Sequence, residues 1–521
     1  MDNFCGISQF NYTSNYTVNQ LILPLEVGVM IAKDDPMWTF LRVMEGVPMT
    51  NLFRHTVSGR QEYDPRMMMH LVLFAYMNQI YSLRKMEEVC RTDLRFIFLS
   101  RGAQPSHMAF QRFISEVLAT KIDRLFTDVV KTLVGMENID TNVVYLDGTK
   151  IEANANKFTF VWKKAVERYR NQLYAKIDQE IQRYAEAEND TSILNYQRPT
   201  YTANDVKEIR QRTWTELGNQ PLVNGKGTRK SPKQRRYEAF SAFHEKLKEY
   251  EAKIACCGED RNSYSKTDPD ATFMHMKEDH YMKTGIFKPG YNLQIGVSDE
   301  YILALTVSQD RSDARTFIPL MEAVHQTLGH FPITPVADAG YGFYENYRFC
   351  DTHDMELYLK YPHFAQDNAK PTAKQRYRAR TWEKMEDGNL RCPEGRILEA
   401  QPILMTASGR PSQSFVCPSC EGCLQKSNCT KSDGNRTVTV NPKLVEYEQI
   451  ARMNLQSPAG IQHRMNRSIQ AEGAFGILKQ NYGMDRFHRR GLKNVENEAK
   501  LVAIGFNLMK FHQKSFRVSP S

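Results

Sequence analysis

Two short apolar runs in this sequence each end on an aspartate, and this pattern constrains the fold more than any other. Residues 143–146 are apolar and precede Asp147, which Gly-Thr-Lys follows. The run in ITPVADAGYG ends on Asp338, with Gly340 and Gly342 close behind. Short β-branched runs bounded by turn residues predict buried strands, and glycine lets a ligand approach the backbone closely. Both runs therefore predict strands that end on a carboxylate.

The segments around these strands predict an α/β fold with a mixed sheet. YNLQIGVSDE and YILALTVSQD read as a hairpin joined by Asp299 and Glu300, and RTFIPLMEAVHQTLG as an amphipathic helix that Gly329 closes. Sites in open α/β sheets form at strand ends, where two carboxylates suit a hard divalent cation such as Mg²⁺. The alternative is that Asp147 and Asp338 only cap turns after their strands.

A helix near the end of the sequence offers a third carboxylate. In SIQAEGAFGILKQ, Glu472 stands among small residues, so this face of the helix can lie against a sheet edge. Lys479 follows seven residues later, which is two helical turns, and therefore shares the face of Glu472. A lysine at that place can meet a phosphate beside a bound metal. Taken alone, Glu472 also fits an ordinary acid on a helix surface.

The rest of the chain predicts further parts around this α/β core. A helical stretch precedes it, with Pro65 in a first turn and Ser106 as an N-cap, and its short helices fit either DNA docking or a solvated bundle. Two charged helices and a cysteine-rich tract read as insertions. We divide the chain into a lead-in 1–61, a helical domain 62–138, an α/β domain 139–512 with insertions at 158–262 and 363–440, and a tail 513–521.

The charge balance favours an anionic partner. The 521 residues include 69 Lys and Arg against 60 Asp and Glu, a net charge of +9, which suits nucleic acid. No apolar run approaches the ~18 residues of a membrane span, and no signal peptide opens the chain, so we expect a cytoplasmic protein. Basic residues that could contact phosphate are Arg464, Arg467, Arg486, Arg489, Arg490 and Lys493, with Lys277, His280, Lys283 and the loop 226–236 as further candidates.

Four cysteines fall close together in CPSCEGCLQKSNC. They are Cys417, Cys420, Cys423 and Cys429, and Cys392 lies upstream as an alternative ligand. Paired C-x2-C spacings chelate Zn²⁺ well, because a tight turn brings both sulfurs to one ion. A structural Zn²⁺ site is one interpretation, and reduced free thiols or an unoccupied relic of such a site is the other.

Several segments in this order resemble the DDE transposases of bacterial insertion sequences, in the subgroup with an N-terminal helical domain. The segments are LDGTKIEANANKFTFVWKK, DPDATFMHMKEDHYMKTGIFKPGYNLQIGV, ADAGYG and AEGAFGILKQ. The resemblance covers roughly residues 20–512 and implies an RNase H-like catalytic core. It implies that Asp147, Asp338 and Glu472 hold two Mg²⁺ ions, for which Mn²⁺ substitutes, and that Lys479 belongs to the catalytic site. Double-stranded DNA would be the partner of a homodimer assembled on it.

The implied reaction is DNA transposition. Such an enzyme binds the terminal inverted repeats of its element, cleaves the strands, and joins the 3′-hydroxyl to target DNA by transesterification. Alternatives are an RNase H-like nuclease without strand transfer and an inactive DNA-binding regulator. The sequence departs from the related signature Tyr-x2-Arg-x3-Glu-x6-Lys, because Met465 and Ser468 stand at the tyrosine and arginine positions. Arg464 and Arg467 lie out of register, which leaves open which arginine contacts DNA.

Overall fold

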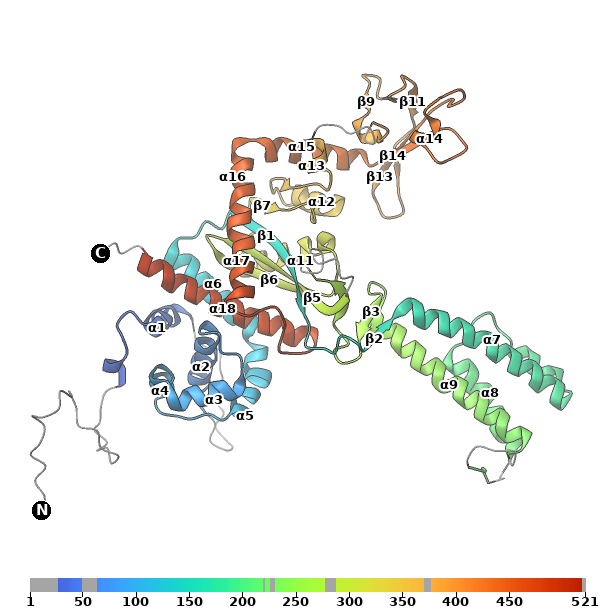
Figure 1. The fold of residues 1–521 in the computed structure, drawn as a ribbon, viewed down its shortest axis with the longest axis horizontal. Helices are drawn as coiled ribbons and strands as arrows, with labels where there is room; N and C mark the ends of the chain where they lie inside the picture. The colour runs from blue at the N-terminus through green and yellow to red at the C-terminus, as the bar shows by residue number, and fades with distance from the viewer. Residues whose placement is uncertain are drawn as a thin grey trace, which may run out of the picture.

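A computed structural model describes residues 27–48, 63–218, 221–224, 230–276, 287–369 and 376–517. A mixed sheet lies at its centre, with helices of the N-terminal region on one side, a helical arm, and a separate β-rich lobe (Figure 1). Lys277, His280, Lys283 and residues 226–229 of the basic loop, all candidates for DNA contact, lie outside the described residues.

The main sheet is built on its longest strand, β5. On one edge of β5, β4 pairs with its first part and β6 with its second part; on the other edge β1, β7 and β8 follow in that order. β5 is antiparallel to its three neighbours β4, β6 and β1, whereas β1, β7 and β8 are parallel to one another. The bounds are β1 Val143–Glu152, β4 Thr272–His275, β5 Phe287–Ser298, β6 Tyr301–Ser308, β7 Thr334–Ala337 and β8 Tyr358–Leu359.

The predicted hairpin and the helix after it are confirmed. Asp299 and Glu300 join β5 to β6 with positive φ angles of 53° and 68°, as a two-residue turn between twisted strands requires. The helix is α11 (Phe317–Leu328), and Gly329 ends it in the left-handed conformation. On the sheet, a Cβ added at Gly296 would meet Val144, Leu146 and Val324, so the even-numbered residues of β1 face α11.

The other face of β1 meets a long helical segment near the end of the chain. This segment comprises α15 (Pro442–Gln456), α16 (Pro458–Arg467), a π-helical turn (Ser468–Glu472) and α17 (Gly473–Gln480). Tyr145 of β1 contacts α16 through its hydroxyl, which lies 3.3 Å from Nδ1 of His463. The segment therefore runs beside β1 and β7 (Figure 1) and brings its residues to the face that carries Asp147.

One hydrophobic core joins the N-terminal helices to the sheet. The long helix α18 (Leu492–Arg517) packs against α1, α2, α6 and β6. It approaches α2 so closely that a Cβ at Gly505 would lie 2.7 Å from the carbonyl of Tyr76. The N-terminal helices are α1 Pro36–Gly46, α2 Pro65–Met77, α3 Leu83–Thr92, α4 Leu94–Ser100, α5 His107–Arg112 and α6 Ile122–Glu137. Because α1 packs on α6 and α18, the helical region begins before residue 62.

The predicted charged insertion is an arm that leads away from the sheet (Figure 1). It holds α7 (Lys163–Glu188), α8 (Ala203–Leu217) and α9 (Pro232–Cys257), of which the sequence indicated only the first and last. At its base β2 (Phe160–Trp162) pairs with β3 (Ser263–Ser265). The three helices share a core of their own.

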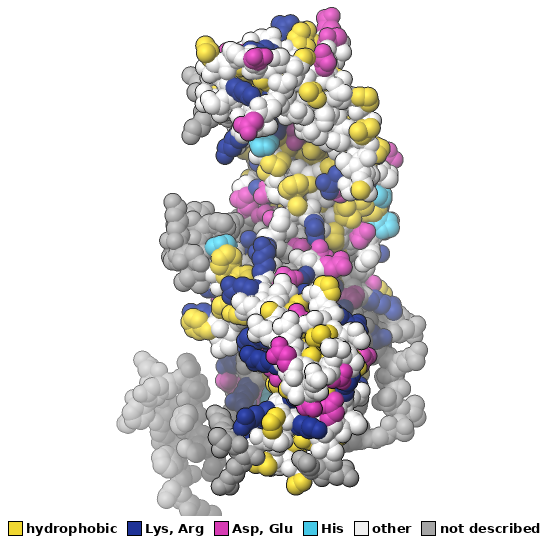
Figure 2. Space-filling model, turned by 90° about the vertical axis from the view of Figure 1, so that its right-hand side faces the viewer, with side chains coloured by type: hydrophobic (Ala, Val, Ile, Leu, Met, Phe, Trp, Pro, Cys, Tyr) yellow, Lys and Arg dark blue, Asp and Glu magenta, His cyan; other side chains and the backbone are white. Residues whose placement is uncertain are grey.

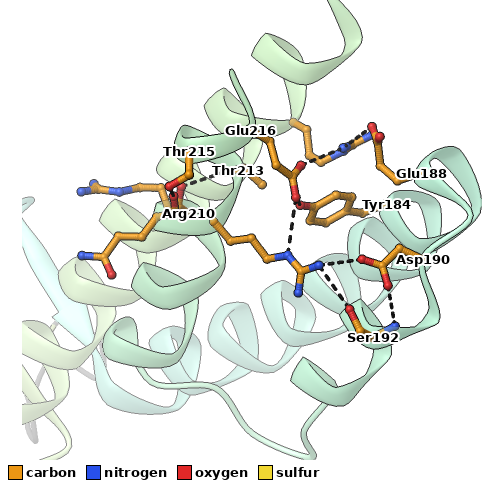
Figure 3. Close-up of polar contacts among 11 residues, drawn as sticks. Tyr184, Glu188, Asp190, Ser192, Arg210, Thr213, Thr215 and Glu216 are labelled. Carbon is orange, nitrogen blue, oxygen red and sulfur yellow. Dashed lines mark hydrogen bonds and ion pairs between the residues drawn. The ribbon is translucent and has the colours of Figure 1, made fainter. Parts of the chain in front are cut away.

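Buried charges fasten the far part of this arm. The Arg236 side chain is 7% exposed, donates to Glu188 at 2.8 Å and lies 4.0 Å above the ring of Tyr184. The Tyr184 hydroxyl donates to Glu216, which joins α7 to α8 (Figure 3). Seen along the arm, basic and acidic side chains are intermixed (Figure 2), so this face shows no single sign of charge.

The cysteine-rich insertion forms a small β lobe, and α15 follows its last strand directly. The lobe follows α12 (Tyr344–Thr352), β8 and α13 (Phe364–Asp367). Its elements are β9 Glu383–Lys384, β10 Leu390–Arg391, β11 Ile397–Ala400, β12 Leu404–Met405, β13 Pro411–Val416, α14 Lys426–Cys429 and β14 Thr437–Val440. Among the helices of the described residues, none combines the length and the apolar character needed to cross a membrane.

Candidate active site

The pairing of β1 with β7 sets Asp147 and Asp338 side by side. Tyr145 lies opposite Val336 in this parallel ladder, and each aspartate comes two residues later. Residues at the same level of neighbouring strands lie about 4.8 Å apart and point to the same face of the sheet. The register therefore brings the backbones of Asp147 and Asp338 to neighbouring positions just beyond the ladder.

Asp147 does not lie at the end of its strand, which corrects the sequence-based expectation. β1 continues to Glu152 because its residues from Tyr145 onward pair with the antiparallel strand β5. The parallel partner β7 stops at Ala337, so Asp147 lies where the β1–β7 ladder ends rather than where β1 ends. Asp147 is 8% exposed and is held in a rigid, central strand.

Asp338 lies in the loop that follows β7 and is partly exposed. Its carboxylate accepts a hydrogen bond of 2.8 Å from the backbone N–H of Gly340. A Cβ at Gly340 would come within 3.0 Å of that carboxylate and 3.3 Å of Asp313, so the loop has no room for a larger residue there. Gly340 thereby fixes the direction of Asp338.

A π-helical turn brings Glu472 and Arg467 together. In a regular α-helix, residues five positions apart point about 140° away from each other, because each residue turns the helix by about 100°. The turn at Ser468–Glu472 is π-helical, which adds one residue to the helix and closes this angle. Nη2 of Arg467 donates to Glu472 at 2.6 Å, and Ser468 donates to the same carboxylate at 2.9 Å. Arg467, which the sequence placed out of register, therefore faces the same way as Glu472.

Arg467 also reaches the first aspartate. Its Nη1 lies 3.6 Å from Oδ1 of Asp147, and the Arg467 side chain is 9% exposed. Nε and Nη1 of Arg467 find no hydrogen-bond partner among the described residues. The guanidinium is thus a nearly buried cation between two carboxylates. Through it, Asp147 on β1 is connected to Glu472 in the π-helical turn.

A second cation, Lys360, lies next to this group. Burial is the main reason that the pKa of Lys360 is lowered, and the positive charges of Arg467 and Arg464 lower it further, against the attraction of Asp338 and Glu472. Lys360 follows β8, whose parallel pairing with β7 places it beside the Asp338 loop. Positively and negatively charged side chains therefore lie close together at this edge of the sheet.

The donor set suits a hard cation, although no ligand cage is preformed. Carboxylate oxygens are the ligands that Mg²⁺ and Mn²⁺ prefer. Within the described part of the chain, no three His, Cys, Asp or Glu side chains are grouped as metal ligands. Arg467 lies between Asp147 and Glu472, where its positive charge offsets their mutual repulsion.

Comparison with known protein families identifies the chain. The family model "Transposase DDE domain" matches residues 391–512, which include the helical segment with Glu472. The family model "Transposase domain (DUF772)" matches residues 26–116, which hold the N-terminal helices. Together the two matches indicate a DDE transposase of the insertion-sequence type. Neither the curated proteins nor the solved structures include a match to it.

In this transposase, polar residues that the sequence did not indicate support the two aspartates. Asp313 accepts hydrogen bonds from Asn292 at 2.8 Å and Gln294 at 2.9 Å, and the Tyr341 hydroxyl donates to Gln294. Burial raises the pKa of Tyr341 far above its usual value, and the charges of Asp313, Asp147 and Asp338 raise it further. Asp313 belongs to a polar loop without periodicity, so only the fold reveals its place.

Gly148 makes this support possible. A Cβ on Gly148 would lie 2.2 Å from Nε2 of Gln294, so a larger residue would displace that amide. The glycine in the LDGT motif is therefore explained by packing against the neighbouring strand β5, directly after Asp147.

The predicted DNA-contacting residues mostly have partners inside the transposase. Arg486 donates to the carbonyls of Ala153 and Ala155 at 3.3 and 3.4 Å. Further contacts are Arg490 to the Asn154 carbonyl at 2.7 Å, Lys493 to Asp123 at 3.4 Å, and Arg464 at 5.5 Å above the ring of Phe364. Arg489 donates its backbone N–H to Glu498, and Lys479 lies half-buried on α17. Their DNA contacts stay predictions.

Proposed function

We propose that this transposase binds the terminal inverted repeats of its element, cleaves the DNA at the ends and joins the 3′-hydroxyl to target DNA. The observation that carries the proposal is the ladder register that sets Asp147 beside Asp338, with Glu472 linked to Asp147 through Arg467. The order β6-β5-β1-β7-β8, with β5 reversed relative to the others, supports an RNase H-like core.

Asp147, Asp338 and Glu472 would hold two Mg²⁺ ions, or Mn²⁺ in their place. When bound, such ions activate the attacking oxygen and stabilise the leaving oxygen of an in-line displacement. Asp147 lies in the central strand β1, and the N–H of Gly340 holds the carboxylate of Asp338, which supports their role as metal ligands. Glu472 has a side chain that is 45% exposed and completes the group from the helix side.

The nearby cations have a role of their own in this proposal. Arg467 keeps the carboxylates from repelling each other until metal and DNA arrive, and its buried guanidinium then turns to the scissile phosphate. Lys360 and Lys479 add positive charge on the same side, because phosphate contacts gain from clustered Lys and Arg. Two DNA ends must meet for transposition, so we expect a homodimer assembled on DNA, with the N-terminal helices on the terminal repeats.

The test is an assay of strand cleavage and joining. Labelled DNA carrying the element ends would be incubated with the transposase in Mg²⁺ or Mn²⁺, using wild type, Asp147→Asn, Asp338→Asn and Glu472→Gln. We expect end-specific nicks and joined products from wild type, and a loss of both by about 10³-fold in each variant, because each removes a carboxylate charge of the metal site. Glu322→Gln, on the exposed face of α11, is the matched control.

The other results separate the alternatives. Cleavage without joined products would identify a nuclease. End-specific binding without any cleavage by wild type would identify a regulator. Activity that is equal in wild type and all three variants would refute the proposed metal site.

A further inference from the structure

The cysteine-rich lobe has a hydrophobic core too small to stabilise it alone. Its strands are two to six residues long. Small units of this kind usually depend on disulfides or a structural metal. The buried residues of its core cluster are Trp382, Leu390, Leu398, Phe415, Cys417, Cys420 and Val438. The cysteines are thus part of what little core there is.

Two β-hairpins place cysteines at neighbouring ends of this lobe. Cys392 follows β10, and its turn is closed by the bonds from its N–H to Arg396 at 2.8 Å and from Gly395 to its carbonyl at 2.9 Å. Cys417 follows β13, with its N–H bonded to the carbonyl of Arg436 at 2.9 Å. Because β11 pairs with β13 through Glu399 and Val416, the two hairpins lie side by side with their cysteine turns together.

The cysteine side chains meet at one small cavity. Its volume is about 20 Å³, which is room for one small ion or water. Its lining includes Cys392, Cys417, Cys420, Cys423 and Cys429. Four of these five also pack into the core of the lobe, whereas Cys423 does not. The structure thereby separates one cysteine from the rest, which sequence spacing did not.

The surroundings of the cavity suit thiolates. The backbone N–H of Arg436 donates to Sγ of Cys420 at 3.2 Å, and Arg396 holds the adjacent turn by donating to the carbonyl of Glu421 at 2.7 Å. Arg396 and Arg436 both line the cavity, and Nε of Arg436 lacks a hydrogen-bond partner among the described residues. A Zn²⁺ ion with four thiolates carries a net charge of −2, which these two guanidinium groups would offset.

We propose that Cys392, Cys417, Cys420 and Cys429 bind one structural Zn²⁺ that joins the two hairpins, and that Cys423 is not a ligand. Thiolate ligands select Zn²⁺, and a closed four-cysteine site is structural rather than catalytic. Within the described residues these side chains are not grouped as metal ligands, so binding requires them to rotate about χ1 toward the cavity that they already line. The inference does not depend on the proposed function.

Metal binding must also displace protons from these thiols. Burial is the main cause that raises the pKa of Cys417 to about 11, and burial likewise raises the pKa of Cys429. Zinc occupancy should fall as the pH is lowered, because protons compete for the same sulfurs.

The experiment is a zinc count on the full-length transposase, purified under reducing conditions. We expect one zinc per chain in wild type by elemental analysis, and Co²⁺ in its place should give the absorption bands of a tetrahedral thiolate site. Zinc should be lost in C392S, C417S, C420S and C429S, and kept in the matched control C423S.

Chelator treatment of wild type tests the proposal without any substitution. Removing zinc should make residues 376–440 sensitive to protease while the arm stays protected, and added zinc should restore the protection. Absence of zinc from wild type supplied with it would overturn the proposal, as would zinc that C423S loses and C429S keeps. A disulfide between Cys417 and Cys420 in the reduced protein, found by mass spectrometry, would replace the metal site with a redox pair.

Discussion

Arg467 holds the two nearest acids of the candidate active site with a side chain that is almost entirely buried. A buried carboxylate left without its counter-charge costs free energy, because desolvation is then not offset. Bound metal would supply the same positive charge to Asp147 and Glu472. Arg467 and a divalent cation should therefore stabilise the folded transposase in partly interchangeable ways.

Replacing Arg467 by methionine should make the stability of the transposase depend on metal. We expect R467M to lower the free energy of unfolding by about 1–3 kcal/mol without metal, and Mg²⁺ to recover more of this loss than it adds to wild type. Thermal unfolding with and without Mg²⁺ measures both effects. R464M is the control, because Arg464 lies over the ring of Phe364 and forms no ion pair within the part of the chain that the structure describes. Equal Mg²⁺ shifts in wild type and R467M would contradict the expectation.

Gly148 offers a second test at the scale of one residue. Gly148→Ala should destabilise the transposase by about 1–3 kcal/mol, since the new methyl group would displace Gln294 from Asp313 and Tyr341. Gly135→Ala is the control, because Gly135 lies inside α6 with open space around it, and alanine there should stabilise the helix by about 0.5–1 kcal/mol. Urea unfolding compares the two. If both substitutions stabilise, the packing explanation for Gly148 is wrong.

At the scale of elements, the sequence predicted helix ends that are set by residues next to them in the chain. Pro65 begins α2 with Asp64 as its N-cap, and Gly329 ends α11, because these signals act within one turn of a helix. The sequence placed Asp147 at a strand end, whereas β1 runs past it because it pairs there with β5, some 140 residues later in the chain. The sequence did not indicate the π-helical turn for the same reason, because its contacts are with the distant strands β1 and β5.

The π-helical turn behaves as a single inserted residue, which a deletion can test. Removing Ile469, which is 61% exposed, should convert the turn to regular α-helix while α16 and α17 keep their contacts. We expect this variant to stay folded, with the contact of Tyr145 and His463 retained. Deleting Glu322 from the regular helix α11 is the control, and it should unfold the protein by turning every later residue by about 100°. Circular dichroism and thermal unfolding report both results, and equal damage from the two deletions would contradict the interpretation.

The junction before α18 predicts a dependence on pH. The hydrogen bond that the His488 ring makes to the carboxylate of Glu498 is the main cause that raises the pKa of His488, and Nδ1 lies 2.8 Å from this buried carboxylate. A raised pKa in the folded state means that protonated His488 stabilises fully below pH 6.5 and that this contribution is lost as the pH rises through the folded-state pKa. The difference in melting temperature between wild type and H488Q should therefore be larger at pH 5.5 than at pH 8.5. A difference that is constant with pH would exclude the ion pair.

At the scale of the whole molecule, one core unites the N-terminal helices with the sheet, and a second core holds the arm. Sequence-based boundaries separated a helical domain from the α/β domain, because α18, which packs on both, lies more than 400 residues after α2. The helices and the sheet should consequently unfold together. The arm joins the sheet-containing part of the molecule mainly through β2 and β3 at its base. Its helices should therefore unfold separately from the main core.

Two matched substitutions test this division. Phe240→Ala in the arm and Phe506→Ala in α18 each remove a ring that is at most 2% exposed, which costs about 3–5 kcal/mol. Hydrogen exchange should quicken only in α7, α8 and α9 for the first variant, and in both the N-terminal helices and the sheet for the second. Faster exchange throughout the described residues in both variants would refute two separate cores.

The ribosome synthesises α18 after all the elements that pack on it, and this order affects when the core can form. Asp147 and Asp338 leave the ribosome long before Glu472, and α18, on which both α2 and β6 pack, follows later still. A nascent chain or a prematurely terminated one therefore lacks either the third carboxylate or the helix that completes the core. Under the proposed function, only a finished polypeptide could cut DNA, which protects the host chromosome from fragments of the enzyme.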